Sequence, residues 1–390
     1  MVYDVIIIGG GAAGMRTAIQ AKKNNKSVLV IEHGDRVGRK ILSTGNGRCN
    51  LTNMNCRVDL FEQNPEGIYP YFTSGVKSFV EEVIGKSDCR DTLDFFGGLG
   101  LLFEIKNDYV YPRSGQASSV LDALRFACED AGVELILNYQ PISIIKNEKG
   151  FNIDNSYYSR KLVIAAGGNS ACKSGSDGSG YELARLFGHQ IVKPRPALCG
   201  INCSDKFFKA LAGVRNDSTV KLFADGKEVI RATGNLQFND YGLSGIPVFQ
   251  ISSDFGRLNE SGCRLSLSVD LLPEFAEDEL ILAVKANPQL LGILNKKLAK
   301  VILKMSDGSA ESKVKLIKHF IATPNSLRSF DESQVTAGGV STDEINPKTM
   351  MSRLIDGLYF AGEIIDVNGI CGGYNLQWAW STGQIAGNSI

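Results

Sequence analysis

The sequence lacks the features that mark several classes of protein. Its nine cysteines form no Cys-x-x-Cys pair, and its three histidines lie far apart along the 390 residues. That spacing leaves zinc and redox-dithiol sites without support, so we predict no metal and nine reduced, mostly buried thiols. No apolar run approaches the ~18 residues that span a bilayer. No basic segment precedes an apolar one at the N-terminus, so we expect a cytoplasmic protein with no membrane partner.

The chain also lacks net charge. Lysine plus arginine and aspartate plus glutamate number 42 each, so no overall field draws it to polyanions. We therefore expect a small-molecule substrate and no nucleic-acid partner. One segment departs from this balance, and it is compatible with either an acidic ligand or an ordinary solvated helix face. Its lysines are Lys285, Lys296, Lys297, Lys300, Lys304, Lys313, Lys315 and Lys318.

The most informative motif that is present begins at residue 4. An apolar run to Ile8 predicts a buried parallel strand, and it leads into Gly9-x-Gly11-x-x-Gly14 and a predicted helix to Lys23. Such glycines permit a tight turn, close approach of a pyrophosphate and close helix–strand packing. A second strand ends at Glu32, 18 residues after Gly14, where a carboxylate binds an adenosine ribose. The motif predicts an ADP-containing cofactor, with FAD and NAD both open.

A long polar loop follows Glu32. Residues 36–53 are rich in glycine, asparagine and small hydroxyls, and irregular stretches of this length are usually functional when they are not disordered. We predict that Arg39 and Lys40 neutralise the pyrophosphate. The segment 45–50 is then expected to lie against a planar ring.

Three blocks, at 9–53, 111–181 and 335–384, resemble a bacterial FAD-binding oxidoreductase family known as aminoacetone-oxidase-like, which includes a bile-acid 3-oxo-Δ4-type reductase (desaturase). The resemblance is carried by Gly47-Arg48-Cys49-Asn50-x-Thr52-Asn53 and by Gly372-Gly373-Tyr374-Asn375-Leu376. Where the family has three glycines before the arginine, this chain has Gly45-Asn46-Gly47. It also has Asp240 where the family block normally has histidine.

The resemblance implies an α/β fold. A Rossmann-like FAD-binding domain of the two-dinucleotide-binding-domain type is expected from residues 1–191 and 331–390. A β-barrel-like domain (192–270 and 322–330) is inserted in it. A small helical domain (271–321) is inserted in turn.

The C-terminal block favours FAD over NAD. A strand ending at Gly362-Glu363 is where such flavoproteins hold the ribityl chain. The helix after Gly373 is expected to aim N–H groups at the flavin O2 edge, which stabilises the charge of reduced flavin. A NAD dehydrogenase needs no such block.

The cofactor-binding residues predicted from motif and resemblance together come from both ends of the chain. Pro141, at the position that usually pairs with adenine through its backbone, offers only a carbonyl because proline has no N–H. The full set is Gly9, Gly11, Ala12, Ala13, Gly14, Glu32, His33, Arg39, Lys40, Gly45, Asn46, Gly47, Arg48, Cys49, Asn50, Pro141, Ala166, Gly167, Gly168, Gly362, Glu363, Asp366, Gly373, Tyr374, Asn375 and Leu376.

The leading functional hypothesis is an FAD-dependent oxidoreductase that exchanges a hydride with a C=C or C–H bond of a small organic substrate. NAD(P)H is the expected diffusible donor, because no second Gly-x-Gly-x-x-Gly unit is visible. One alternative is an oxidase that passes electrons from an amine such as aminoacetone to O2. Another is a non-catalytic flavin-binding scaffold. The catalytic acid or base is unassigned, with Tyr241 and Tyr374 as candidates, and the sequence predicts neither substrate identity nor oligomeric state.

Overall fold

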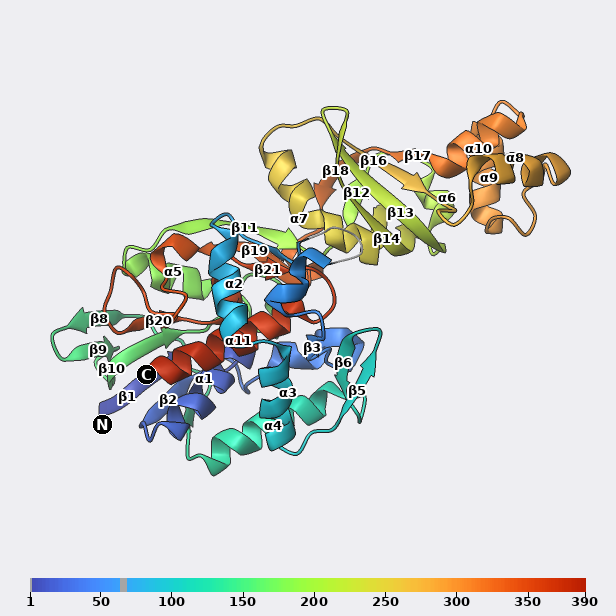
Figure 1. Cartoon of the computed structure of the whole chain (residues 1–390). Coiled ribbons are helices and arrows are strands. Elements are labelled where there is room, and N and C mark those ends of the chain that lie inside the picture. Colours follow the sequence, from blue (N-terminus) through green and yellow to red (C-terminus); the bar gives the residue numbers. More distant parts are fainter. Residues whose placement is uncertain (1, 64–68) are drawn as a thin grey trace. The chain divides into compact units, whose positions relative to one another are not determined.

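The structure is a computed structural model that describes residues 2–63 and 69–390 (Figure 1). The chain forms two compact units, which we describe separately. Unit 1 comprises Met1–Arg195 and Val335–Ile390, and unit 2 comprises Pro196–Gln334. Within the described residues, no helix has both the length and the apolar character needed to cross a membrane.

A parallel sheet forms the centre of unit 1. Its strands run in the order β7-β2-β1-β10, and β20 pairs with the far edge of β10, also in parallel. Apolar β-branched residues fill β1 and β2 because both faces of the sheet are covered. An antiparallel hairpin, β8–β9, extends β10. The bounds are β1 Val2–Ile8, β2 Val28–Ile31, β7 Glu134–Ile136, β8 Ile144–Asn147, β9 Gly150–Ile153, β10 Tyr157–Ile164 and β20 Leu358–Phe360.

Helices from both ends of the chain cover this sheet. The first helix, α1, packs against the last, α11 (Figure 1), and also against α4. Met15, Phe96 and Trp380 meet in one buried apolar cluster, so α1, α3 and α11 share a core. The bounds are α1 Ala12–Lys23, α2 Lys77–Lys86, α3 Cys89–Gly98, α4 Ala117–Asp130, α5 Ser179–Leu186 and α11 Tyr374–Ser389.

Short elements complete unit 1. The polar loop after β2 is predicted to be irregular, but it contains 3₁₀ turns over Arg39–Gly47 with a kink at Thr44–Asn46. Further 3₁₀ turns of unit 1 lie at Val58–Gln63, Cys172–Ser174, Thr342–Glu344 and Gly362–Ile364. One more, Phe330–Glu332, belongs to unit 2. The remaining strands are β3 Thr52–Asn53, β4 Tyr71–Phe72, β5 Phe103–Lys106, β6 Tyr109–Pro112, β11 Ile191–Ala197, β19 Val335–Val340 and β21 Asn368–Gly369.

Unit 2 is built on a seven-stranded antiparallel sheet in the order β17-β16-β13-β14-β15-β12-β18. The first and last strands of this order, β17 and β18, are separated in the chain by Thr323 alone, and β18 also contacts β16, so the sheet curls back on itself as a barrel-like domain does. Helix α7 packs on β14, and sequence analysis missed it. The bounds are β12 Ile201–Cys203, α6 Phe208–Leu211, β13 Arg215–Ala224, β14 Lys227–Asn239, β15 Gly242–Gly245, α7 Ile246–Glu260, β16 Leu265–Asp270, α8 Glu277–Ala286, α9 Lys296–Met305, α10 Ala310–Lys318, β17 Phe320–Ala322 and β18 Pro324–Leu327.

Candidate functional site

The glycine-rich turn between β1 and α1 forms an open cradle. Gly9 has a φ of 104°, and a Cβ there would lie 2.5 Å from the carbonyl oxygen of Ala165. A Cβ on Gly14 would lie 1.9 Å from the carbonyl oxygen of Gly9, so the helix can approach the strand only without a side chain. At Gly11, by contrast, no atom lies within 4 Å of that position. The turn therefore has no room for side chains where it packs on the protein at Gly9 and Gly14, but it has free space at Gly11, beside the N-terminus of α1.

The open side of the turn suits an anion. Gly11 is the N-cap of α1, and its carbonyl accepts the N–H of Met15. The N–H groups of the first helical turn, at Ala12, Ala13 and Gly14, have no intrahelical acceptor because of helix geometry. They add to the positive end of the helix dipole, which is a common binding site for phosphate.

Glu32 fixes the shape of this turn. One carboxylate oxygen accepts the N–H of Gly10 at 2.8 Å and the other accepts that of Gly34 at 2.8 Å. The side chain of His33 lies beside it, with Nδ1 3.3 Å from Oε1. A carboxylate has about four acceptor positions, so Glu32 can hold the loop and still accept bonds from ribose hydroxyls.

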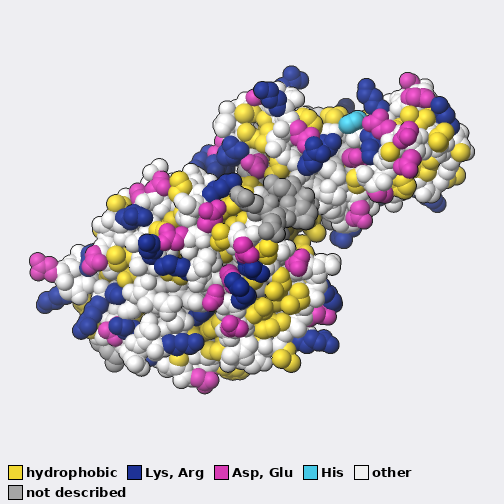
Figure 2. Space-filling model, in the orientation of Figure 1, with side chains coloured by type: hydrophobic (Ala, Val, Ile, Leu, Met, Phe, Trp, Pro, Cys, Tyr) yellow, Lys and Arg dark blue, Asp and Glu magenta, His cyan; other side chains and the backbone are white. Residues whose placement is uncertain are grey.

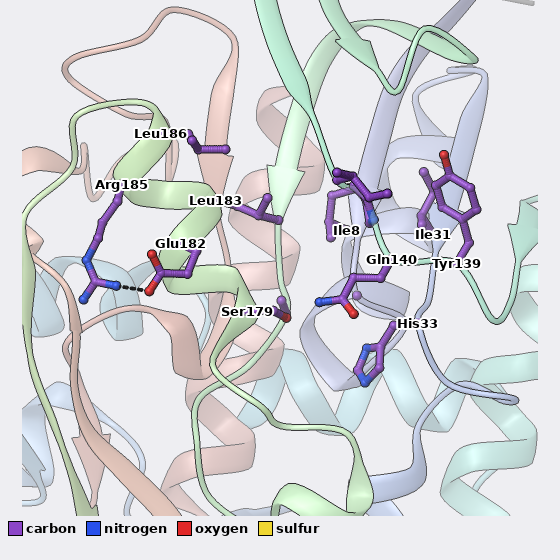
Figure 3. A pocket seen from close by; sticks show the side chains of 14 residues that line it. Ile8, Ile31, His33, Tyr139, Gln140, Ser179, Glu182, Leu183, Arg185 and Leu186 are labelled. Atoms are coloured by element: carbon purple, nitrogen blue, oxygen red, sulfur yellow. Dashed lines mark hydrogen bonds and ion pairs between the residues drawn. The ribbon is translucent and has the colours of Figure 1, made fainter.

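A cavity of about 460 Å³ opens beside the turn. Figure 3 shows Ile8, Ile31, His33, Tyr139 and Gln140 on one side of it and the side chains of α5 on the other. The structure thus brings together four predicted residues, Gly9, His33, Pro141 and Ala166. The α5 residues were missed; they are Ser179, Glu182, Leu183, Arg185 and Leu186. The only signal for them was that α5 starts after Gly178, in the loop that follows β10.

Lys40 and Glu363 form an ion pair at 2.7 Å. The second oxygen of Glu363 accepts the backbone N–H of Thr336 at 2.8 Å. Gly168 allows this approach, because a Cβ on it would lie 3.2 Å from the carboxyl carbon of Glu363. Gly167 and Gly362 are the neighbours of this pair along the chain. Residues expected at the phosphates and at the ribityl chain therefore meet directly.

Arg39 is placed differently. Its guanidinium donates to the carbonyl of Lys173 at 3.1 Å and lies 3.6 Å from the carboxylate of Asp35. Sequence analysis assigned Arg39 and Lys40 the same phosphate role. In the structure, only Lys40 is paired with Glu363.

The loop at 45–50 has unusual backbone conformations. Gly45, Asn46, Gly47 and Cys49 all have positive φ, between 55° and 81°. Burial raises the pKa of the Cys49 thiol to about 12, so this cysteine is inert. Asn50 is buried, and its side-chain oxygen has no partner within the described part of the chain. A buried acceptor without a donor is costly, so this oxygen is suited to a donor on a ligand.

Arg48 turns away from the loop toward an aromatic side chain. Its guanidinium carbon lies 4.7 Å from the ring centre of Tyr111. This is a cation–π distance, and it links the loop to β6.

The start of α11 is pressed against this loop. A Cβ on Gly373 would lie 2.6 Å from the carbonyl of Thr52, so only glycine fits there. The side chain of Asn375 bonds to the N–H and the carbonyl of Gly369, at 2.8 and 2.9 Å. It therefore shapes the loop just before the helix. The N–H groups of Tyr374, Asn375 and Leu376 fall in the first turn and have no intrahelical acceptor.

Tyr374 is buried, and its ring packs edge-on to that of Tyr71. The Tyr71 hydroxyl donates to the carbonyl of Tyr374 at 3.1 Å. Burial raises the pKa of the Tyr374 phenol well above its usual value. This phenol stays protonated at any physiological pH.

One residue that sequence analysis did not assign to the site joins these pieces. Gln377 is fully buried, and its amide oxygen accepts the hydroxyls of Thr52 at 2.6 Å and Thr92 at 2.9 Å. Its amide nitrogen donates to the carbonyl of Ser87 and the hydroxyl of Ser381. Gln377 thereby ties α11 to β3 and α3. Its place in the predicted helix gave no sign of this role.

Two other predicted residues lie in separate environments. Asp366 accepts the N–H of Ser74 at 2.9 Å and also its hydroxyl, and burial raises the pKa of its carboxyl. Tyr241 belongs to unit 2, between β14 and β15. The guanidinium carbon of Arg328 lies 4.2 Å from its ring centre.

Apart from Cys49 and His33, the cysteines and histidines lie outside the residues described above for the site. All nine cysteines are free thiols, and Cys172 is the exposed one. Each histidine lies beside a glutamate: His33 with Glu32, His189 with Glu344 and His319 with Glu277. Among residues 2–63 and 69–390, no group of three or more His, Cys, Asp or Glu side chains could hold a metal ion.

The residues present fit an ADP-containing cofactor. The cradle at Gly11 is open, Glu32 retains acceptor capacity, the adjoining cavity has apolar walls, and Asn50 has an unsatisfied buried oxygen. A Rossmann sheet with such a turn, completed by a C-terminal strand and helix, belongs to the class of FAD-dependent oxidoreductases.

The chain belongs to the HI0933-like family, because the model for the HI0933-like protein Rossmann domain matches residues 3–389. A 3-dehydro-bile acid delta(4,6)-reductase of Clostridium scindens is 36% identical, with 98% of each chain covered. A ribosomal RNA dihydrouridine synthase of Haemophilus influenzae is 31% identical, covering 99% of this chain and 98% of its own. The enzyme of that name from Escherichia coli is also 31% identical, with 97% and 96% covered.

Among solved structures, the chain is similar to a 3-ketosteroid-delta4-(5alpha)-dehydrogenase of Rhodococcus jostii. The TM-score is 0.51 at 14% identity, covering 100% of this chain and 96% of that one. At this identity the likeness concerns the fold alone.

Proposed function

We propose that this protein is an FAD-dependent reductase that saturates a carbon–carbon double bond conjugated to a carbonyl group. The observation that supports it most is the meeting of the two chain ends. Lys40 and Glu363 pair at 2.7 Å, and Gly373 packs on Thr52. These contacts support a single site that combines the turn suited to a pyrophosphate with the helix suited to a flavin edge.

The roles of the residues follow from their positions. Ala12 to Gly14 offer N–H groups to the pyrophosphate, and Glu32 binds the ribose. Lys40 and Glu363 would hold the chain between pyrophosphate and ring, and the N-terminus of α11 would hold the ring. Bound FAD, once reduced by NAD(P)H, would supply the hydride, and a proton would complete the saturation of the C=C bond. The helix N-terminus lowers the energy of the anionic reduced form.

The named activities of the relatives support the type of reaction. A delta(4,6)-reductase of a 3-dehydro bile acid and a dihydrouridine synthase both saturate a C=C bond conjugated to a C=O group. The relatives that carry these names are 36% and 31% identical along nearly the whole chain. We therefore favour reduction over the amine-oxidase alternative.

Two substrate classes remain, a small enone and a uridine base in RNA. The lack of net charge predicts no nucleic-acid partner, but net charge does not report how charge is distributed. The exposed lysines of α9 favour the second class.

Rapid-mixing spectroscopy of the FAD-loaded protein without oxygen tests the reaction. We expect NADH or NADPH to bleach the flavin absorbance. A conjugated substrate, either a 3-oxo-Δ4 steroid or a uridine-containing RNA, should restore it with saturation of one C=C bond. If neither nucleotide bleaches the flavin and amines yield hydrogen peroxide, the protein is a flavin oxidase and not the proposed reductase. If no substrate changes the flavin, the protein is a non-catalytic flavin-binding scaffold.

A further inference from the structure

Helix α9 carries an unpaired row of positive charge. Lys296, Lys300 and Lys304 are exposed and recur every four residues. Because a helix rises about 1.5 Å per residue, successive lysines stand about 6 Å apart along the axis. No acidic side chain pairs with any of them among the described residues.

The opposite face of α9 accounts for its stability. Leu298, Val301 and Ile302 are buried against the rest of unit 2. The helix therefore does not need its lysines for packing, and they form the outer side of an amphipathic helix. Asn295 caps the helix by accepting the N–H of Lys297.

The neighbouring α6 segment carries two more exposed lysines. Helices α6 and α9 contact each other, and the Nζ of Lys297 donates to the carbonyl of Ala212 at the end of α6, at 2.7 Å. Lys206 and Lys209 are exposed on that segment, and the described residues offer neither an acidic partner. We call the five side chains Lys206, Lys209, Lys296, Lys300 and Lys304 the α6–α9 lysine face.

The acidic groups of the helical segment belong to elements other than α9. Glu277, Asp278 and Glu279 occupy the first turn of α8, which packs on α10. Glu311 pairs with Lys285, and Asp307 accepts the N–H of Ser309. Helix α9 itself contains no acidic residue. Figure 2 shows acidic and basic groups interspersed over the face of the molecule in view, the helical segment included.

We infer that the α6–α9 lysine face binds the phosphate backbone of RNA. Its lysines present regularly spaced cations, which suit a chain of phosphates and do not read base sequence. Lysine is a flexible point charge and not a planar fork, so one small anion gains little from five such side chains. A strand of phosphates engages several at once and releases counterions.

The inference rests on the proposed function only for the identity of the base that reacts. RNA binding is measured without turnover, and reduction of a small enone is measured without RNA. Failure of one can therefore be told from failure of the other.

The test compares two variants of equal charge. Lys296→Gln/Lys300→Gln/Lys304→Gln removes part of the face. Lys23→Gln/Lys149→Gln/Lys227→Gln removes three exposed lysines from other elements. Fluorescence anisotropy with a short fluorescein-labelled single-stranded RNA gives the affinity at several salt concentrations. FAD content and thermal melting confirm that both variants fold.

We expect the first variant to bind about tenfold more weakly or worse, and its slope of log K against log salt to fall by about 2. The control should keep both within error. Equal loss in the two variants, or no binding of RNA by the native chain at physiological salt, would overturn the inference. Equal or tighter binding to phosphatidylcholine–phosphatidylglycerol vesicles through the same lysines would also overturn it, in favour of a membrane surface.

Discussion

The Nζ atom of Lys40 lies 2.7 Å from Oε2 of Glu363, although 323 positions separate the two residues. Both side chains are about three-quarters buried, with 26% and 21% of their surface exposed. Such a pair differs from a solvated surface ion pair, because removing one partner leaves a poorly solvated charge. It joins the loop after β2 to the turn after β20.

Replacing Lys40 tests whether it serves the cofactor or only its partner. We expect Lys40→Met to weaken FAD binding at least tenfold, as measured by flavin fluorescence on the apoprotein. The exposed Lys348, 3.9 Å from Glu82, gives the control Lys348→Met, which should bind normally. If Lys40→Met/Glu363→Gln restores native affinity, Lys40 only neutralises Glu363.

Alanine substitutions at two glycines of the same motif should impair different properties, the stability of the apoprotein in one case and FAD affinity in the other. Gly14→Ala places its Cβ 1.9 Å from a backbone oxygen, so the apoprotein should unfold at lower temperature. Gly11→Ala meets no atom within 4 Å, at an ordinary φ of −79°. Its apoprotein should melt normally but lose FAD affinity. Equal melting temperatures for the two variants would contradict this difference.

Glu32→Gln should loosen the turn as well as the cofactor. An amide has one N–H₂ end, which would face the N–H of Gly10 or Gly34 and leave it unsatisfied. We expect a loss of about 1–3 kcal/mol in the free energy of unfolding of the apoprotein, together with release of FAD on purification. Asp35→Asn, at an exposed position, is the control. A yellow, fully stable Glu32→Gln protein would rule out both roles.

His189 predicts how stability depends on pH. Its ring bonds to Glu344 and Ser352, both at 2.8 Å, and burial lowers its pKa below the usual value. The unfolded chain therefore takes up a proton near pH 6.5, where the native chain does not. Stability from neutral His189 is present above that pH and is lost as pH falls below it, by up to about 1.4 kcal/mol per pH unit.

Urea unfolding between pH 7.5 and 5 measures this slope. We expect His189→Gln to be less stable at pH 7.5 but to show a shallower fall toward pH 5. His319→Gln, at an exposed position beside Glu277, should keep the native slope. A native slope in the His189 variant would assign the acid sensitivity to other groups.

Gln377 should matter for stability more than for chemistry. Gln377→Leu leaves the hydroxyls of Thr52 and Thr92 without their buried acceptor, and the carbonyl of Ser87 keeps only the hydroxyl of Ser381. We expect the free energy of unfolding to fall by about 2–4 kcal/mol, as measured in urea. Gln116→Leu at the exposed start of α4 is the control. A loss below 1 kcal/mol would mean that these groups find other partners.

Much of unit 1 can be predicted from the sequence because its signals are local. The apolar runs of β1 and β2, the glycine turn and the acid at Glu32 all fall within 30 residues. The predicted helix at the C-terminus also corresponds to α11.

The rest depends on contacts between distant segments. The partner of Lys40 lies 323 residues away, and the α5 wall of the cavity has no motif of its own. Helix α7 follows β15 without a break, and its only start signal was Pro247 in the first turn. The hydrogen bonds of Gln377 likewise join α11 to β3 and α3, and no hydrophobic periodicity in the sequence indicates that these elements meet.

Helix α11 has a consequence for how the protein is made. A ribosome synthesises the Gly9–Gly14 turn long before the helix that begins at Tyr374. While the intervening chain is translated, the early βαβ segment therefore lacks both the strand Leu358–Phe360 and helix α11, which packs against α1 in the complete fold. Flavin capture should be completed only after the segment from Leu358 through α11 has been synthesised, so nascent chains stalled before Leu358 should be colourless and readily cleaved by protease.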